Sequence, residues 1–328
     1  MSSADRVLVT GAGGFIGRWS VPALLRLGYE VHAVLSGNAN RDLPGQLRGA
    51  QVHFADLLDE SAAAKLMSEV APTHLLHFAW IATPGLYWSS AENFRWLAAS
   101  EHLLRCFRAH GGRRVVMAGS CAEYDWSRVE VCDELLSPLA DDAAAGHAPA
   151  GLSPYAACKI ALQSSLADFG HSERVSTAWG RIFFQFGPYE HPDRLVPSVI
   201  SNLLQNREAP CTHGRQIRSF LHVADVGAAF AAVLASHLQG PVNIGSDERI
   251  TLAELADRIG RQIGRPQLLR LGARTATPGE PPILVPDVHR LHREAGWRPT
   301  FTLDTALRDT IAWWRDRLGG AAADGTVP

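Results

Sequence analysis

Two residues one helical turn apart, Tyr155 and Lys159, could together transfer a proton. They lie in the segment Tyr-Ala-Ala-Cys-Lys, so a phenol and an ammonium group share one face of a predicted helix. A cation at that spacing stabilises a phenolate and brings the pKa of the phenol toward the working pH. The chain has two lysines, Lys65 and Lys159, against 29 arginines, so chance seldom places a lysine there. The spacing predicts general acid–base chemistry at Tyr155.

Three regularly spaced glycines follow the first predicted strand. Gly11, Gly14 and Gly17 stand between that strand and a predicted helix, with Phe15 and Ile16 in the same turn. Backbone N–H groups at the start of such a helix, together with the helix dipole, bind a pyrophosphate. The spacing is Gly-x-x-Gly-x-x-Gly, and in this context it predicts a dinucleotide site. A plain tight turn is the alternative.

The residues after the next two strands indicate which dinucleotide binds. An acid after the second strand binds the ribose 2′-hydroxyl of NAD, whereas an arginine suits the 2′-phosphate of NADP. Ser36 stands where the acid is expected and Arg41 follows, so NADP is favoured. NAD remains possible, because Arg41 could also be a solvated loop charge. Asp56 and Leu57 are placed to meet the adenine, although an aspartate at a strand end often caps a helix.

The elements that must position these residues alternate between strands and helices. Short β-branched runs are separated by helical patterns, which is typical of βαβ units and a parallel sheet. That order predicts a Rossmann-type, doubly wound α/β fold. The predicted strands are 6–10, 30–35, 51–55, 74–78, 114–118 and 175–184, and the predicted helices are 14–27, 59–70, 88–110 and 154–169.

The second half of the chain predicts a smaller α/β lobe. Prolines punctuate shorter elements after residue 186, and residues 251–264 show helical spacing that ends at Gly264 and Pro266. We expect an NADP-binding domain over residues 1–186, with part of 215–250 returning to it. A substrate-binding lobe over 187–318 and a flexible tail over 319–328 complete the expected organisation.

Composition and charge exclude several classes of protein. Thirty-one basic against 33 acidic side chains give a formal charge of -2, which argues against nucleic acid as a partner. The five cysteines form no Cys-x-x-Cys pair and the fourteen histidines lack ligand spacing, so we expect neither a disulfide framework nor a metal site. The first apolar run is too short for a signal peptide or a membrane span. We therefore expect a cytoplasmic protein without a membrane partner.

A series of segments, in order, resembles the extended short-chain dehydrogenase/reductase family. The resemblance is to its NAD-dependent epimerase/dehydratase type, which modifies nucleotide sugars, and in appearance most to the nucleotide-sugar 4-ketoreductases. It spans nearly the whole chain. The matching segments are TGAGGFIG at 10–17, the Asp56-Leu57 pair, HFAW at 77–80, GSCAEY at 119–124, SPYAACK at 153–159, RIFFQFGP at 181–188 and RSFLHVADV at 218–226.

The resemblance implies a catalytic triad of Ser120, Tyr155 and Lys159. Ser120 is implied to hydrogen-bond the substrate oxygen beside Tyr155, and Lys159 to hold the nicotinamide ribose as well. An ordinary serine at a strand end is the alternative for Ser120. Phe78 and Ala79 are implied to lie beside the cofactor, together with the tryptophan that follows them.

The same resemblance implies residues that contact the substrate. Arg218 matches the arginine that family members use on the nucleotide pyrophosphate, with a structural salt bridge as the alternative, and Arg194 looks like part of the nucleotide-sugar wall. Four aromatic residues could line the sugar or fill core: Trp80, Tyr87, Trp88 and Trp126. The helices at 88–110 and 154–169 pair across a dimer interface in many relatives, so a homodimer is implied.

Departures from the family pattern limit the reaction. In the 4,6-dehydratases the two residues after the catalytic hydroxyl are Asp and Glu, which protonate and deprotonate during water loss. Cys121 and Ala122 stand there, next to the implied substrate, and Cys121 is more consistent with packing than with a nucleophile. The family's usual asparagine is Phe184 and its usual aspartate is Ser219, which points to a different binding pose or another substrate.

These features predict an NADPH-dependent ketoreductase that acts on a nucleotide-diphosphate 4-keto-6-deoxysugar. A nucleotide-sugar 4-epimerase that retains NAD uses the same triad and is the first alternative. A reductase of a non-sugar carbonyl is the second, and an NADP-sensing regulator without turnover is the third. The shape of the pocket selects among CDP, dTDP, GDP and UDP and sets the stereochemistry of the product.

Overall fold

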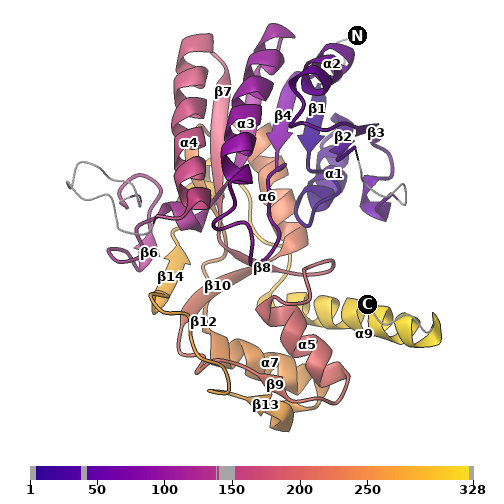
Figure 1. Ribbon diagram of the computed structural model, residues 1–328, viewed down its shortest axis with the longest axis vertical. Coiled ribbons are helices and arrows are strands. Elements are labelled where there is room, and N and C mark those ends of the chain that lie inside the picture. The colour runs from indigo at the N-terminus through magenta and orange to yellow at the C-terminus, as the bar shows by residue number, and fades with distance from the viewer. Residues whose placement is uncertain (1–4, 38–42, 138, 140–151, 325–328) are drawn as a thin grey trace.

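The computed structural model describes residues 5–37, 43–137, 139 and 152–324, and Figure 1 shows two parts stacked along its long axis. The upper part is a sheet covered by helices on both faces, and the smaller lower part lies beyond the ends of its strands. The glycine turn, Ser120 and Tyr155 all belong to segments that leave the carboxyl ends of strands or begin helices at that edge. In an open α/β sheet this edge is where ligands bind.

The upper sheet is parallel and has seven strands in the order β11-β7-β5-β4-β1-β2-β3. The order reverses between β1 and β4, which confirms the predicted doubly wound α/β fold. Buried Val, Leu and Ala side chains fill the strands, as expected for a sheet covered on both faces. The strands are β1 (Arg6–Thr10), β2 (Glu30–Leu35), β3 (Gln51–Phe54), β4 (His74–His77), β5 (Arg114–Ser120), β7 (Ser176–Ile182) and β11 (Gly240–Ile244).

In the described part of the chain, helices cover both faces of this sheet. One hydrophobic cluster joins the sheet to α1 (Gly17–Arg26) and α6 (Val223–Ala235). A second cluster joins the opposite face to α2 (Glu60–Val70), α3 (Glu92–Ala109) and α4 (Pro154–Glu173). The chain therefore returns to the upper part through α6 and β11 after it has visited the lower one.

Two helix starts differ from the sequence prediction for physical reasons. α1 begins at Gly17 rather than residue 14, because the glycine segment first forms a turn in which Gly14 N donates to Gly11 O. α3 begins at Glu92 rather than residue 88, because Trp88 uses its carbonyl oxygen to accept from Tyr155 N. The predicted strand 175–184 is split at Phe183 into β7 and β8 (Phe184–Phe186).

The lower part has a small sheet of its own and a third hydrophobic cluster. The path β12-β10-β14-β6 forms this sheet, with β8 paired to β10, and α5, α7 and α9 pack their buried residues together. Its strands are β6 (Val131–Cys132), β10 (Ile217–His222), β12 (Arg249–Thr251) and β14 (Ile283–Pro286), with a separate pair β9 (Ala209–Pro210) and β13 (Leu269–Arg270). Its helices are α5 (Leu195–Leu204), α7 (Leu252–Ile263) and α9 (Leu303–Asp324). α8 (His289–Glu294) instead lies against β11, and its Leu291 packs in the first cluster of the upper part. The short 3-10 turns within the described residues are η1 (Gly45–Leu47), η2 (Cys121–Glu123) and η4 (Pro266–Leu268).

The last helix extends into the segment that the sequence analysis expected to be a flexible tail. α9 continues through Asp324, so it includes six of the ten residues expected to form a flexible tail. Residues 321–323 are three consecutive alanines, and alanine has the highest intrinsic helix propensity. The prediction of a tail rested on the small size of these residues and not on that propensity. No helix within the described ranges is long and apolar enough to cross a membrane.

Candidate active site

The glycine turn has the geometry of a phosphate cradle. Gly11 has φ +64, and a Cβ there would stand 2.9 Å from the backbone N of Ala79. A Cβ at Gly17 would lie 2.2 Å from Gly11 O, so no larger residue fits the start of α1. Phe15 and Ile16 complete the turn, and Gly14 is exposed. The exposed backbone at a helix start fits the pyrophosphate of a dinucleotide.

A buried network fixes the ends of β1 and β4 beneath this turn. The Thr10 hydroxyl accepts hydrogen bonds from the backbone N–H groups of Phe78 and Ala79. It also bonds His77 Nδ1 at 2.7 Å, while His77 Nε2 bonds Ser100. Burial lowers the pKa of His77 to about 3, so the imidazole is neutral and structural. Phe78 and Ala79 are thereby held beside Gly11, where the sequence expected cofactor contacts.

The helix start at Ser153 places the acid–base pair. Ser153 caps α4 by accepting from Ala156 N, and Pro154 occupies the first helical position, where it loses no hydrogen bond. Tyr155 then lies in the first turn and Lys159 one turn further, on the same face. The Lys159 Nζ is 6.0 Å from the centre of the Tyr155 ring. The structure therefore brings the predicted pair together.

Lys159 is buried and its ammonium group has two close partners. Nζ donates to Ala118 O at 2.9 Å and lies 3.8 Å from the centre of the Trp80 ring. Burial lowers the pKa of Lys159 to about 7, and the Glu123 carboxylate opposes that shift. Lys159 is therefore expected to gain or lose its proton near neutral pH.

Tyr155 is held between Ser120 and aromatic rings. Burial raises the pKa of Tyr155 well above its usual range, and a hydrogen bond with Ser120 lowers it by less. The prediction that Lys159 brings this pKa toward the working pH is wrong for this structure, because burial has the larger effect. The phenol therefore keeps its proton. Tyr87 and Trp88 contact the Tyr155 ring edge-on, with centroids 4.9 and 5.6 Å away.

A buried ion pair that the sequence analysis missed supports Ser120. Arg181 Nε donates to Glu123 Oε2 at 2.7 Å, and both side chains are almost fully buried. Glu123 also accepts from Ser120 N at 2.7 Å and from Trp179 Nε1. Ser120 and Glu123 form a capping box, a Ser-x-x-Glu pattern that the sequence contains and that could have suggested the pairing.

The two residues after Ser120 contribute no second acid or base. Burial raises the pKa of the Cys121 thiol to about 12, so the thiol is neutral. Ala122 is buried within η2, and its contact with the substrate stays a prediction. The Cys121 carbonyl accepts from Trp126 Nε1, so the turn is fixed. Trp126 in turn meets Trp88 edge-on, with centroids 6.1 Å apart.

The two predicted substrate arginines differ in their surroundings. Arg218 is buried and pairs with Glu280 at 3.0 Å, and it also donates to Pro281 O. The structure thus contains the salt bridge that the sequence left as the alternative, and contact with a nucleotide pyrophosphate stays a prediction. Arg218 also lies over the ring of Phe184, the residue that departs from the family pattern. Arg194 is exposed and lies 5.7 Å from the Tyr87 ring centre.

The residues expected near the adenosine part of the cofactor lie at the ends of β2 and β3. Ser36 is exposed directly after β2, and Arg41 lies outside the described residues. Asp56 is exposed, and its carboxylate accepts from Leu58 N in the turn after β3. The helix cap that the sequence left open for Asp56 is supplied by Asp59, which caps α2. Leu57 is buried and packs in the second cluster. No carboxylate therefore follows β2 directly in the described part of the chain.

Arg18 is a further residue that the sequence analysis passed over. Its guanidinium donates to Gly13 O and Gly14 O, within the glycine turn. It also stacks on the Tyr189 ring at 4.2 Å, and Tyr189 itself has φ +71. This contact ties the glycine turn to the segment after β8.

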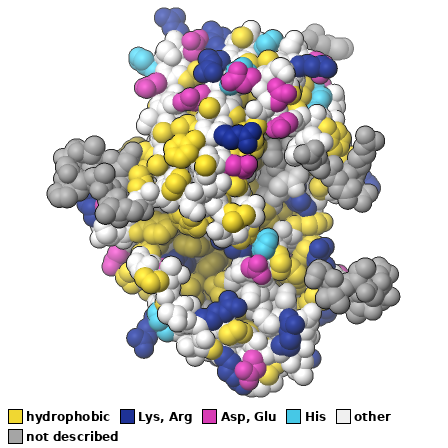
Figure 2. Space-filling model, viewed as in Figure 1, with side chains coloured by type: hydrophobic (Ala, Val, Ile, Leu, Met, Phe, Trp, Pro, Cys, Tyr) yellow, Lys and Arg dark blue, Asp and Glu magenta, His cyan; other side chains and the backbone are white. Residues whose placement is uncertain are grey.

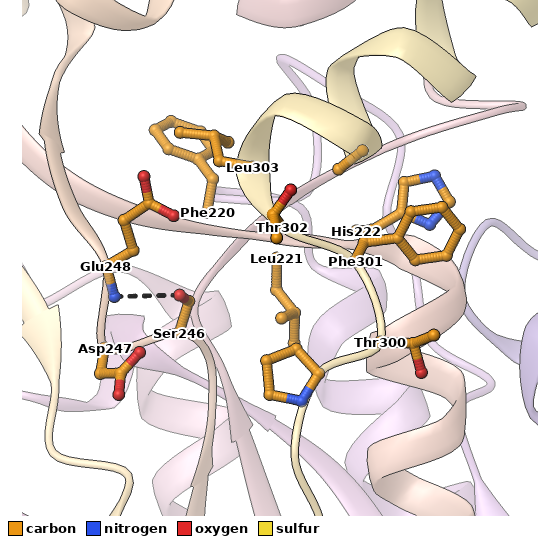
Figure 3. A pocket seen from close by; sticks show the side chains of 12 residues that line it. Phe220, Leu221, His222, Ser246, Asp247, Glu248, Thr300, Phe301, Thr302 and Leu303 are labelled. Atoms are coloured by element: carbon orange, nitrogen blue, oxygen red, sulfur yellow. Dashed lines mark hydrogen bonds between the residues drawn. The ribbon is translucent and has the colours of Figure 1, made fainter.

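The visible face of the molecule is hollowed between the upper and lower parts. Figure 2 shows that the walls of this hollow are largely hydrophobic. A separate cavity of about 230 Å³ lies where β10, the loop after β11 and the start of α9 meet, and Ser120, Tyr155 and Lys159 do not line it. Its polar lining includes Ser246, whose hydroxyl accepts from Glu248 N (Figure 3). Among the described residues no group of three or more His, Cys, Asp or Glu side chains is arranged to hold a metal ion.

Comparison with known proteins agrees with this geometry. Residues 7–245 match the model of the NAD dependent epimerase/dehydratase family. The chain is 28% identical to dTDP-glucose 4,6-dehydratase of Streptomyces niveus (95% of this chain, 93% of that protein) and 23% identical to UDP-glucose 4-epimerase of Mus musculus (97% and 99%).

Two solved structures are similar to this chain over nearly its whole length. One is UDP-glucose 4-epimerase of Thermus thermophilus in complex with NAD, with TM-score 0.78, 26% identity and coverage of 94% and 99% of the two chains. The other is dTDP-glucose 4,6-dehydratase of Streptomyces venezuelae with NAD bound, with TM-score 0.79, 25% identity and coverage of 96% and 98%. The protein is thus an enzyme that belongs to the NAD dependent epimerase/dehydratase family.

Proposed function

We propose that this enzyme uses NADPH to reduce the keto group of a nucleotide-diphosphate 4-keto-6-deoxysugar. The observation that carries the proposal is a protonated Tyr155 beside Ser120, with no second acid or base at Cys121 or Ala122. Reduction needs one proton donor at the carbonyl oxygen, whereas loss of water needs a further acid and base. The proton donor that reduction needs is thus proposed to be Tyr155, and among the described residues positions 121 and 122 offer no acid and base for loss of water.

The glycine turn fits a dinucleotide, because glycine at positions 11 and 17 lets the backbone close into a tight turn at the start of α1, where a Cβ would clash with Ala79 or Gly11. When bound, the reduced nicotinamide supplies the hydride. NADP is the proposed form, since Ser36 leaves no carboxylate directly after β2 to bind a ribose 2′-hydroxyl. Arg41 is the proposed partner of the 2′-phosphate.

The chain's own residues would then act on the carbonyl oxygen. Ser120 donates a hydrogen bond to that oxygen and orients it toward Tyr155. Tyr155 gives up its proton, and the Lys159 ammonium stabilises the phenolate that remains. Tyr87 and Trp88 border Tyr155 and narrow the space around the reacting carbon. The aromatic walls suit the apolar face of a deoxysugar.

The substrate class rests on similarity together with this site. The relatives are named for dTDP-glucose and UDP-glucose, so a nucleotide-diphosphate sugar is the proposed class here. Arg194, exposed beside Tyr87, is the proposed contact of the diphosphate, whereas Arg218 contributes only if Glu280 releases it. Cytoplasmic location and a homodimer formed by α3 and α4 remain predictions.

A 4-epimerase that retains NAD is a second candidate. It is favoured by the likeness to UDP-glucose 4-epimerases along nearly the whole chain. The same Tyr155 and Lys159 would serve it, and only the fate of the hydride differs.

The test is a cofactor assay with a panel of nucleotide-linked 4-keto-6-deoxysugars carrying CDP, dTDP, GDP or UDP. We expect one member to consume NADPH stoichiometrically, and NADH to react more slowly. A sugar that changes configuration while the cofactor stays bound and is not consumed would contradict the reductase and support the epimerase. Reaction with non-sugar carbonyls alone would contradict the substrate class, and cofactor binding without turnover of any carbonyl would indicate a sensor.

A further inference from the structure

One of the two close partners of the buried Lys159 ammonium is an indole ring. Lys159 Nζ lies 3.8 Å from the centre of the Trp80 ring, well within the range of a cation–π interaction. The rings of Tyr155 and Trp179 are more distant, at 6.0 and 5.8 Å. In the described part of the chain no carboxylate forms an ion pair with Lys159, because the nearby Glu123 is engaged by Arg181. The indole face therefore offsets the desolvation of the Lys159 ammonium, as a carboxylate does in a buried salt bridge.

The Trp80 ring is fixed in this place by a hydrogen bond. Its Nε1 donates to Asn93 Oδ1 at 2.8 Å, and Asn93 is fully buried. The Asn93 amide in turn donates to the carbonyl oxygens of Tyr87 and Ser90. One buried amide thus anchors both the indole under Lys159 and the loop whose aromatic rings border Tyr155.

We propose that Trp80 is a positioning residue whose indole face holds the Lys159 ammonium, in its charged form, beside Tyr155. This role differs from the cofactor and substrate contact that the sequence suggested for Trp80. It applies to any reaction in which Tyr155 and Lys159 act together, and to that extent it rests on the proposed function. A tryptophan is the most effective aromatic partner for a cation, and the interaction strengthens when the cation is desolvated, as here.

The titration of Lys159 depends on every group that faces it. Burial lowers its pKa to about 7, and the Glu123 carboxylate and the Cys158 thiol on α4 oppose this. Burial and the Lys159 charge both lower the pKa of His77, so its imidazole is neutral. Burial raises the pKa of Tyr155, so its phenol is protonated. Of these contacts, the indole face is the one that a single substitution removes without changing a titratable group.

The composition of the chain makes a direct measurement possible. Lys65 and Lys159 are its two lysines, so protein labelled with 13C at lysine Cε gives two NMR signals. The Lys65 side chain is 76% exposed, so its signal serves as an internal reference from a solvated lysine. The titration of Lys159 can then be followed without substrate, so a failure of this proposal is distinguishable from a failure of the proposed reaction.

Three variants separate the indole from its surroundings. Trp80→Leu removes the ring, and Trp80→Phe keeps a ring but loses the hydrogen bond to Asn93. Trp96→Leu is the matched control, because it also removes an indole from this cluster. The ring centroids of Trp96 and Trp80 are 6.4 Å apart, and both rings are partly buried. Circular dichroism at each pH checks that the variants are folded, and Trp80→Phe supplies the test if Trp80→Leu is not.

We expect the Lys159 titration midpoint of Trp80→Leu to move to lower pH by about one pH unit, that of Trp80→Phe by less, and that of Trp96→Leu to stay in place. The alkaline limb of kcat against pH should move in parallel, with a smaller effect on KM. An unchanged Lys159 midpoint in both Trp80 variants, or an equal shift in Trp96→Leu, would overturn the proposal.

Discussion

Arg181 Nε lies 2.7 Å from Glu123 Oε2, and both side chains are almost fully buried. The same Glu123 carboxylate accepts a hydrogen bond from the backbone N–H of Ser120. Breaking a buried pair by removing one charge leaves the other uncompensated. Glu123→Gln keeps the shape and removes the charge, and it should lower the free energy of unfolding by about 3 kcal/mol or more.

Chemical denaturation measures this loss. Glu254→Gln, which removes one partner of the exposed pair with Arg258, is the control and should change stability by less than about 1 kcal/mol. Equal effects of the two substitutions would show that the buried pair does not support the site.

Cofactor choice depends on the residue directly after β2. Ser36→Asp places a carboxylate where it can accept from a ribose 2′-hydroxyl and repels a 2′-phosphate. We expect the ratio of kcat/KM for NADPH to that for NADH to fall by about tenfold or more, since one such contact contributes about 1.4 kcal/mol or more. Ser172→Asp, at an exposed position late in α4, should leave the ratio unchanged. A ratio unaffected by Ser36→Asp would contradict the NADP assignment.

Glu190 should make stability depend on pH. Its Oε2 is buried without a hydrogen-bond partner in the described structure, and burial raises its pKa to about 8. The folded protein therefore holds a proton that the unfolded chain has released, and stability falls as pH rises from the ordinary glutamate range through about 8.

Glu190→Gln removes this dependence. Its Tm should equal that of the wild type near pH 4, and should exceed it increasingly up to about pH 8. Thermal unfolding across this range is the measurement. A constant Tm difference at all pH values would mean that Glu190 does not titrate in this window.

Cys121 lies next to Ser120, the proposed catalytic hydroxyl, but should not act as a nucleophile. Its pKa of about 12 leaves very little thiolate near neutral pH. Cys121→Ala should therefore retain kcat within about tenfold, whereas loss of a true nucleophile costs far more. Steady-state kinetics decides, and an acyl or other covalent adduct on Cys121 detected by mass spectrometry would refute this assignment.

Local patterns in the sequence predicted much of the fold and the centre of the site. The glycine turn and the Tyr155–Lys159 spacing are read from nearby residues, so the strand–turn–helix unit and the acid–base pair could be predicted from the sequence. The start of α3 could not, because Trp88 leaves the helical pattern to bond Tyr155, a residue far along the chain. Helical periodicity contains no information about such a contact.

The partners of buried charges were likewise beyond local reasoning. Arg218 was expected to face a nucleotide, yet Glu280, 62 residues away in sequence, pairs with it. Glu123 and Arg181 are 58 residues apart, and only the capping-box pattern hinted that Glu123 had a structural task. Burial also decided the pKa of Tyr155, and burial follows from the packed fold rather than from the spacing of two residues.

The most direct measurement follows the hydride. NADPH that carries deuterium at the transferring carbon is mixed with the reactive 4-keto-6-deoxysugar nucleotide, and the product is analysed by mass spectrometry and NMR. We expect one deuterium on the former carbonyl carbon for each NADP formed, and a fall in rate of at least about a hundredfold in Tyr155→Phe but not in Tyr29→Phe. A product without deuterium, or an unimpaired Tyr155→Phe enzyme, would contradict the account.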